Sequence, residues 1–175
     1  MNVRRSNRLG LLVVTIATAA APAVAGAQSQ RQAEAHGNYS RGMTSESNAW
    51  GAGGQLQFIW GASEAPAQLG GSLGGDYTKQ SGGASQWNTS LDLVLQPGGD
   101  KVVTPYAGGS IGSNWSTGRA AMWSGARAGF ETLAGLQVKV GGGESSRTIK
   151  VEERYGYVRG QEHTLVTRLG IVVPY

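Results

Sequence analysis

The 175-residue sequence contains no cysteine. Disulfides, thiolate metal sites and a lipid anchor on cysteine are therefore excluded. Histidine is also scarce, since His36 and His163 are the only two, and they lie far apart in the chain. Imidazole is the commonest general base and a frequent metal ligand. We therefore expect no metal, no cofactor and no catalytic residue, and predict that the protein is not an enzyme.

After residue 27 the sequence lacks an apolar run of the length that a membrane-spanning helix needs. It also lacks a clustered basic patch. Of its 15 lysines and arginines, three (Arg4, Arg5 and Arg8) lie in the first eight residues, and the remainder carries 12 basic against 11 acidic side chains. Scattered, nearly balanced charge does not fit a nucleic-acid partner.

Residues 1–27 have the organisation of a secretory signal peptide. A basic start is followed by an apolar stretch at 9–21 and by the small-residue sequence Ala25-Gly26-Ala27. These three parts in this order are typical of an exported protein. We predict cleavage after Ala27.

Glycine and aromatic residues are abundant, with 29 glycines, five tryptophans and six tyrosines. Disordered chains are poor in aromatics, so a β protein with glycine-rich strands is the better interpretation. Apolar and polar residues alternate with a period of two in 49–60, as a half-buried strand requires. The same alternation recurs in the segments 69–77, 87–95, 103–115, 148–157 and 165–175, and more weakly in 121–131 and 135–141.

Short turn signals separate these segments and predict antiparallel hairpins. They are Ser81-Gly82-Gly83, Pro97-Gly98-Gly99-Asp100, Ser116-Thr117-Gly118, Gly141-Gly142-Gly143 and Arg159-Gly160. The count is about eight strands, which is the smallest closed transmembrane barrel.

Two arrangements of the strands remain open. Either 49–60 is the first strand and 135–141 pairs separately, or part of 30–43 is an added first strand and 135–147 is a long hairpin end. Residues 28–47 are accordingly an N-terminal tail or a weak first strand, and 48–175 form the barrel.

Aromatic residues at the strand ends favour a transmembrane barrel over a soluble sandwich, because such rings sit well at lipid headgroups. This expected aromatic girdle comprises Trp50, Trp60, Tyr77, Trp87, Trp115, Tyr155 and Tyr175. The opposite strand face is small and glycine-rich with scattered charges, which suits the narrow lumen of an eight-stranded barrel. We predict a lumen ion network of Asp92, Arg127, Glu131, Lys150, Glu152, Arg154 and Arg168. Its charges would either line a polar pore or, as we favour, pair and hold the barrel shut.

The last twelve residues, 164–175, resemble the C-terminal strand by which bacterial outer-membrane barrels are recognised for assembly. The assembly signal would consist of the alternating residues Leu169, Ile171, Val173 and Tyr175. The sequence departs from the pattern in ending on Tyr175 instead of the usual phenylalanine, with Pro174 before it. The resemblance implies the barrel assembly machinery as a partner.

A wider resemblance covers roughly residues 50–175. The Pro-Tyr and alternating glycines of 104–112 resemble a strand of the outer-membrane β-barrel superfamily. The segment 151–155 and the pair Leu169-Gly170 resemble its last two strands. The likeness implies an all-β, up-and-down antiparallel transmembrane barrel in the cell outer membrane, surrounded by lipid. Glu153 departs from the family pattern, since it would face lipid; we place it at the headgroup level, where a charge costs little.

We therefore predict a non-enzymatic integral outer-membrane protein with a structural or surface-interaction role, whose loops make its contacts with an unspecified partner. One alternative is a small-solute channel, and another is a secreted soluble β-barrel that binds a hydrophobic ligand. A fourth hypothesis, an enzyme acting on lipid A, would need the histidine two residues before a serine that marks such deacylases. Neither His36 nor His163 is followed in this way.

Overall fold

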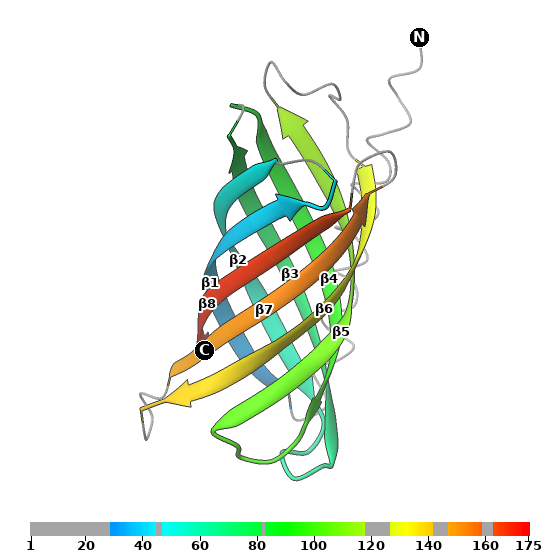
Figure 1. Cartoon of the computed structure of the whole chain (residues 1–175). Coiled ribbons are helices and arrows are strands. Elements are labelled where there is room, and N and C mark those ends of the chain that lie inside the picture. The colour runs from blue at the N-terminus through cyan, green and yellow to red at the C-terminus, as the bar shows by residue number, and fades with distance from the viewer. Residues whose placement is uncertain (1–28, 45–46, 82, 118–126, 142–146, 159–162) are drawn as a thin grey trace.

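The computed structural model describes residues 29–44, 47–81, 83–117, 127–141, 147–158 and 163–175, so the expected leader lies outside the described residues. The described residues form eight strands: β1 (Ser29–Gly42), β2 (Asn48–Trp60), β3 (Ala67–Gln80), β4 (Ser85–Pro97), β5 (Val103–Thr117), β6 (Arg127–Val140), β7 (Arg147–Val158) and β8 (Thr164–Pro174). Each strand pairs antiparallel with its neighbours in the chain, and β1 pairs with β8, which closes the barrel (Figure 1). The predicted all-β class and up-and-down topology are confirmed.

Residues 29–42 are the first strand and not a tail. β1 is paired along almost its whole length with β2 on one side and with β8 on the other. The described barrel therefore begins at Ser29, and of the two alternatives for residues 28–47 the structure has the first strand and not the tail. The strand was hard to predict because its outward positions hold small residues that give little hydrophobic contrast, namely Ala33, Ala35 and Gly37.

The two weak segments predicted at 121–131 and 135–141 are parts of one strand. β6 runs without a break from Arg127 to Val140, in register with β5 and β7, while 121–126 lie outside the described residues. The alternation is interrupted because Leu133 is apolar and yet points inward, where it is buried. The first arrangement, in which 135–141 pairs separately, is therefore wrong. The second has the added first strand that the structure shows, and 135–147 runs from the end of β6 to the start of β7.

Glycines with positive φ occur at three of the predicted glycine turns. Gly83, Gly99 and Gly141 have φ angles of +85°, +94° and +88°, which glycine adopts without steric cost. The turn predicted at 116–118 is displaced, since Ser116 and Thr117 still belong to β5. Gly82 and the predicted turn residues at 118, 142–143 and 159–160 lie outside the described residues.

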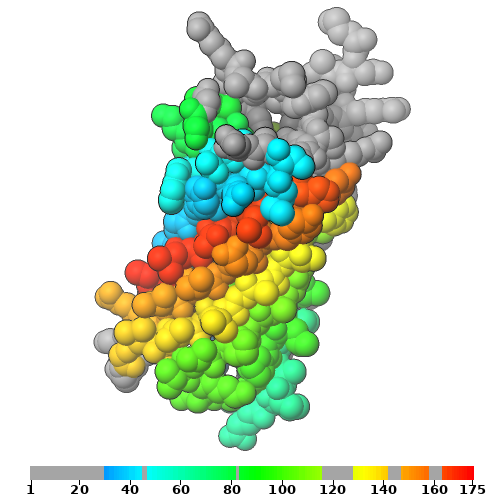
Figure 2. Space-filling view, viewed as in Figure 1, coloured from blue at the N-terminus to red at the C-terminus, as the bar shows by residue number. Residues whose placement is uncertain are grey.

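The outer face of the barrel is apolar. Leucine, isoleucine, valine and aromatic side chains point away from the lumen and are exposed, among them Leu56, Leu69, Leu93, Leu95, Ile111, Leu136, Val151, Leu169 and Ile171. Figure 2 shows the strands of this face running as oblique bands side by side. An exposed apolar surface of this extent marks a contact with lipid or another apolar partner. Within the described residues, no helix is long and apolar enough to cross a membrane.

The strand termini define the two ends of the barrel. β1, β3, β5 and β7 finish, and β2, β4, β6 and β8 start, at what we call the upper end, which is at the top of Figure 1. The lower end holds the opposite termini, including the start of β1 and the end of β8. The interior between the two ends is mostly polar, because most of the side chains buried there are charged or carry an amide or a hydroxyl.

Candidate functional site

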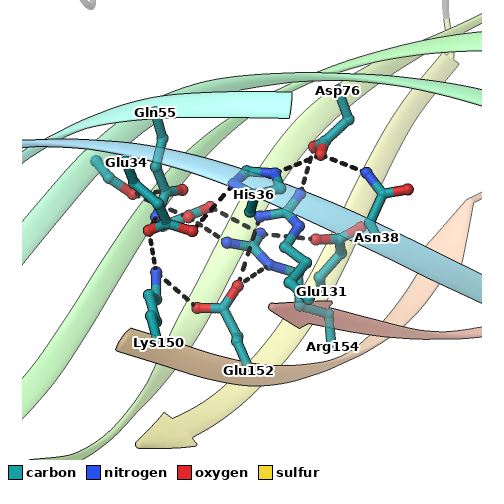
Figure 3. A network of polar contacts seen from close by, with 12 residues as sticks. Glu34, His36, Asn38, Gln55, Asp76, Glu131, Lys150, Glu152 and Arg154 are labelled. Atoms are coloured by element: carbon teal, nitrogen blue, oxygen red, sulfur yellow. Dashed lines mark hydrogen bonds and ion pairs between the residues drawn. The ribbon is translucent and has the colours of Figure 1, made fainter. Parts of the chain in front are cut away.

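Arg154 on β7 lies at the centre of the lumen and is completely buried. Its guanidinium contacts three carboxylates: Nη2 lies 2.5 Å from Asp92 on β4, Nη1 lies 3.0 Å from Glu131 on β6, and Nε lies 2.5 Å from Glu152 (Figure 3). Charge-assisted bonds to a guanidinium are the stronger kind of hydrogen bond. Arg154 thus ties together strands that lie on different sides of the barrel.

Glu152 links Arg154 to the other bases of the lumen. Its carboxylate lies 3.1 Å from Lys150 Nζ and 3.5 Å from Arg168 Nη1. The buried hydroxyl of Tyr106 on β5 donates a hydrogen bond of 2.8 Å to Glu152 Oε2. One carboxylate therefore has partners on β5, β7 and β8.

A second set of contacts reaches the first two strands. Lys150 Nζ lies 2.9 Å from Glu34 Oε2 on β1, and this oxygen also accepts hydrogen bonds from the amides of Gln55 and Gln57 on β2. Arg168 on β8 forms an ion pair with Asp76 on β3. The network therefore includes side chains from all eight strands.

His36 on β1 lies between Glu34 and Asp76 and contacts both. Its Nδ1 lies 3.0 Å from Glu34 Oε1, and its Nε2 lies 2.7 Å from Asp76 Oδ1, which also accepts a hydrogen bond from Asn38 (Figure 3). Both ring nitrogens face carboxylate oxygens, and both can donate only in the imidazolium form. The ring is 5% exposed and faces the lumen.

Sequence reasoning missed Glu34, His36 and Asp76. His36 had been placed in a candidate tail, and Asp76 had not been singled out. The available signal was the strict alternation of polar Glu34, His36 and Asn38 with small residues, which is the pattern of a strand facing a polar lumen.

Glycines make room for the network. An added Cβ at Gly53 would lie 2.5 Å from Asp76 Oδ1 and 2.7 Å from His36 Nε2. A Cβ at Gly170 would lie 2.9 Å from Glu34 Oε1, and one at Gly135 would overlap the Tyr106 hydroxyl. The high glycine content thus has a steric function in the lumen.

Cavities lie on both sides of the network. Toward the upper end, a cavity of about 80 Å³ is lined by amides, hydroxyls and the edge of the network, among them Asn38, Asp76, Ser90, Asn114 and Arg168. Toward the lower end, a cavity of about 230 Å³ is lined by residues that include Gln32, Gln96, Gln137, Asp100 and Lys139. A space of only about 20 Å³ adjoins Tyr106, Lys150 and Glu152 between them.

The lower cavity carries an ion pair at its mouth. Lys139 Nζ donates a hydrogen bond to the exposed carboxylate of Asp100, which follows β4. This hydrogen bond, together with the lysine charge, holds the pKa of Asp100 below its usual range. The contact is open to solvent and contributes little to stability.

The structure brings six of the seven predicted network residues together in the lumen, namely Asp92, Glu131, Lys150, Glu152, Arg154 and Arg168. The side chain of Arg127 lies outside the described residues, although its backbone pairs with Asn114. Glu153 points away from the lumen and accepts a hydrogen bond of 2.8 Å from Thr167.

The residues expected to form an aromatic girdle are unevenly divided. Five lie toward the upper end: Trp50, Tyr77, Trp87, Trp115 and Tyr155. Trp60 and Tyr175 lie at the lower end, where β2 and β8 finish. Tyr39, which was not predicted, packs at a tilt against Trp50 with ring centroids 4.5 Å apart, and Tyr77 packs against Trp87 at 4.9 Å.

Exposed His163 also belongs to the upper aromatic region. Its ring stacks on that of Tyr155 at 5.3 Å, and its Nδ1 forms a 2.8 Å hydrogen bond with the Tyr155 hydroxyl. Tyr157 packs on the same ring at 5.2 Å. Within the part of the chain that the structure describes, no three histidine or acidic side chains are placed to hold a metal ion.

No protein-family model matches the sequence, and no curated protein matches it. Solved structures are similar to it in fold. Neisserial surface protein A has a TM-score of 0.57 at 13% identity, over 84% of this chain and 97% of that one. The attachment invasion locus protein Ail of Yersinia pestis has a TM-score of 0.57 at 13% identity, over 85% and 99%. The outer membrane enzyme PagL has a TM-score of 0.52 at 15% identity, over 81% and 99%.

At these identities the likeness establishes the fold alone. The three similar structures differ in what their names describe, a surface protein, an attachment protein and an enzyme. They share the barrel fold with this chain. The barrel of this chain has an apolar outer face and a polar lumen. The chain is a closed eight-stranded antiparallel barrel with the fold of the small bacterial outer-membrane barrels.

Proposed function

We propose that this barrel is a non-enzymatic integral protein of the outer membrane, with a lumen closed by paired charges and a structural or surface-interaction role. The observation that carries the proposal is the complete burial of Arg154 among Asp92, Glu131 and Glu152. An eight-stranded lumen is only wide enough for side chains to fill. A solute could pass only if these ion pairs broke, and an unpaired buried charge is costly.

The placement of the two histidines supports a non-enzymatic role. His36 is enclosed in the lumen, and carboxylates face both of its ring nitrogens, so it has no free nitrogen for a lipid substrate. His163 is engaged by the hydroxyl of Tyr155. The surface role then falls to the upper end of the barrel, where aromatic rings surround the connections.

Planar-bilayer recording tests the closed lumen. We expect the purified full chain to be recovered in the outer-membrane fraction, to migrate differently on a gel before and after boiling, and to show no conductance steps above the lipid baseline. A general porin inserted under the same conditions is the control for insertion. Clear steps from this protein would favour the channel, whereas recovery as a soluble protein would favour the ligand-binding alternative.

Substitution of the terminal residue, Tyr175, tests whether the barrel assembly machinery recognises the C-terminal strand. Tyr175 is 62% exposed, and its backbone N–H donates a long 3.3 Å hydrogen bond to Arg31. Little folded-state stability therefore depends on its side chain. We expect Tyr175→Ala to lower the outer-membrane level of the protein severalfold in cells while refolding in detergent is unchanged.

The matched control is Tyr157→Ala, which removes an exposed tyrosine from the upper end. It is expected to leave the outer-membrane level near that of the parent. Equal levels of the parent and Tyr175→Ala would remove the terminal residue from the assembly signal. A loss of refolding in detergent would mean that Tyr175 acts on stability instead.

A further inference from the structure

We infer that the upper end of β1, β2 and β3 carries a binding site on the outer face for a phosphate-bearing lipid headgroup, held by Arg41 and Lys79. The inference rests on the proposed membrane role and assigns to it a lipid class and two residues. The lumen network is not involved, because both side chains point away from it. The argument has three steps: the placement of the two cations, their lack of partners, and the level at which they meet the membrane.

The two cations lie on one outward facet, one strand on either side of β2. Arg41 follows Tyr39 by two residues and Lys79 follows Tyr77 by two, so each shares the outward face of its tyrosine. Arg41 is paired with Asn48 and Lys79 with Trp50, both on β2. Two strand spacings and an offset of two residues along β2 separate their backbones, which together amount to about 12 Å.

Neither cation has an acidic partner among the described residues. Within the described ranges, no carboxylate lies within ion-pair distance of Arg41 or Lys79, and both side chains are exposed. The buried bases of the lumen differ in this respect, since Lys150, Arg154 and Arg168 each contact at least two carboxylates. Among the described residues, the facet therefore presents positive charge without an acidic partner.

Aromatic rings place the two cations at the headgroup layer. Tyr39 and Trp50 pack against each other at a tilt, and the Tyr39 hydroxyl donates a 2.9 Å hydrogen bond to Asn48. Such amphipathic rings lie where hydrocarbon meets headgroup. Arg41 lies two residues beyond Tyr39 along β1, a rise of about 6.6 Å toward the phosphates, while Lys79 lies beside Trp50 and reaches the headgroups with its long side chain. A guanidinium binds phosphate in a bidentate manner, and lysine adds a point charge.

Quenching of Trp50 fluorescence by brominated lipids reports this site directly, because Trp50 is 68% exposed and is paired with Lys79. The experiment uses the full chain with its four other tryptophans replaced by phenylalanine, in vesicles of phosphatidylcholine. Brominated phosphatidylglycerol or brominated phosphatidylcholine is added at equal mole fraction. We expect the anionic lipid to quench at least about threefold more effectively, and the preference to shrink at high salt.

The charge variants separate this site from a general attraction to a basic protein. Arg41→Gln with Lys79→Gln is expected to abolish the preference. The control is Arg31→Gln with Arg147→Gln, which removes the same charge from exposed residues at the lower end and should keep the preference. Equal loss in both double variants would overturn the site.

The outcomes also separate the inference from the proposed function. Equal quenching by the two lipids, in a protein that still shows its heat-dependent gel shift, would overturn the lipid site and leave the integral barrel intact. Failure of the parent chain to insert in vesicles would overturn both. If the single-tryptophan chain does not fold, spin-labelled forms of the two lipids with the unmodified chain give the same comparison.

Discussion

Replacing Arg154 by alanine is expected to lower the free energy of unfolding by about 3–5 kcal/mol, because it leaves buried carboxylates without their partner. Among the described residues, Arg154 is the ion-pair partner of both Asp92 and Glu131. Glu152 would still have Lys150 and Arg168 as partners. The side chain is completely enclosed, so water cannot take over its role in the intact barrel. The loss is therefore large for a single substitution.

Urea unfolding in detergent or vesicles, followed by the gel shift, measures this effect. Arg147→Ala is the matched control, since Arg147 lies on the same strand but is exposed at the lower end. It should change the midpoint little. An unchanged midpoint for Arg154→Ala would show that the ion pairs do not hold the barrel together.

A second variant distinguishes lost charge pairing from lost packing. Arg154→Met combined with Asp92→Asn keeps most of the side-chain volume and removes the carboxylate that depends on Arg154 for its ion pair. Replacing buried ion pairs by neutral groups is cheaper than breaking them. The double variant is expected to be more stable than Arg154→Ala, and an equal or lower stability would point to packing as the main contribution.

Alternation in the sequence was sufficient to predict most of the strands and the side chains that face inward. It works where outward residues are large and apolar, as in β2 and β8. It fails where the outward and inward residues differ little in hydrophobicity. β1 has small residues on its outer face, and in β6 the apolar Leu133 points into the lumen. Alternation can be recognised only when the two faces of a strand differ in hydrophobicity, and a strand of alanine, glycine and polar residues shows little difference.

The partners of each lumen charge could not be predicted in the same way. The alternation of residues along each strand shows that Arg154 and Asp92 both face inward. It does not show that they meet, because they are 62 residues apart in the chain. Their contact depends on closure of the barrel and on the register of every hairpin between them. A slip of one residue would turn each side chain to the opposite face. His36 was missed for a related reason, since its partner Asp76 lies two strands away and the sequence left residues 28–47 open between a tail and a strand.

Gly53→Ala is expected to destabilise the barrel by about 1–3 kcal/mol through overpacking of the lumen. The new methyl group would lie 2.5 Å from both Asp76 Oδ1 and the backbone oxygen of Gly75, and 2.7 Å from His36 Nε2. The Gly75 oxygen belongs to the β2–β3 pairing and cannot move alone. The side chains of Asp76 and His36 would have to separate, which breaks one of the contacts that link β1 with β3 across the lumen.

Gly37→Ala is the control that isolates this steric effect. Gly37 follows His36 on β1 and points outward, and a Cβ there would meet only the Gly51 backbone oxygen at 3.9 Å. Both variants change the intrinsic strand preference equally. The difference between their urea midpoints therefore measures the loss of stability caused by steric overlap in the lumen. Gly53→Ala should unfold at lower urea than Gly37→Ala. Coincident midpoints would mean that the lumen can relax around an added methyl group, and that its glycines are not needed to seat the network.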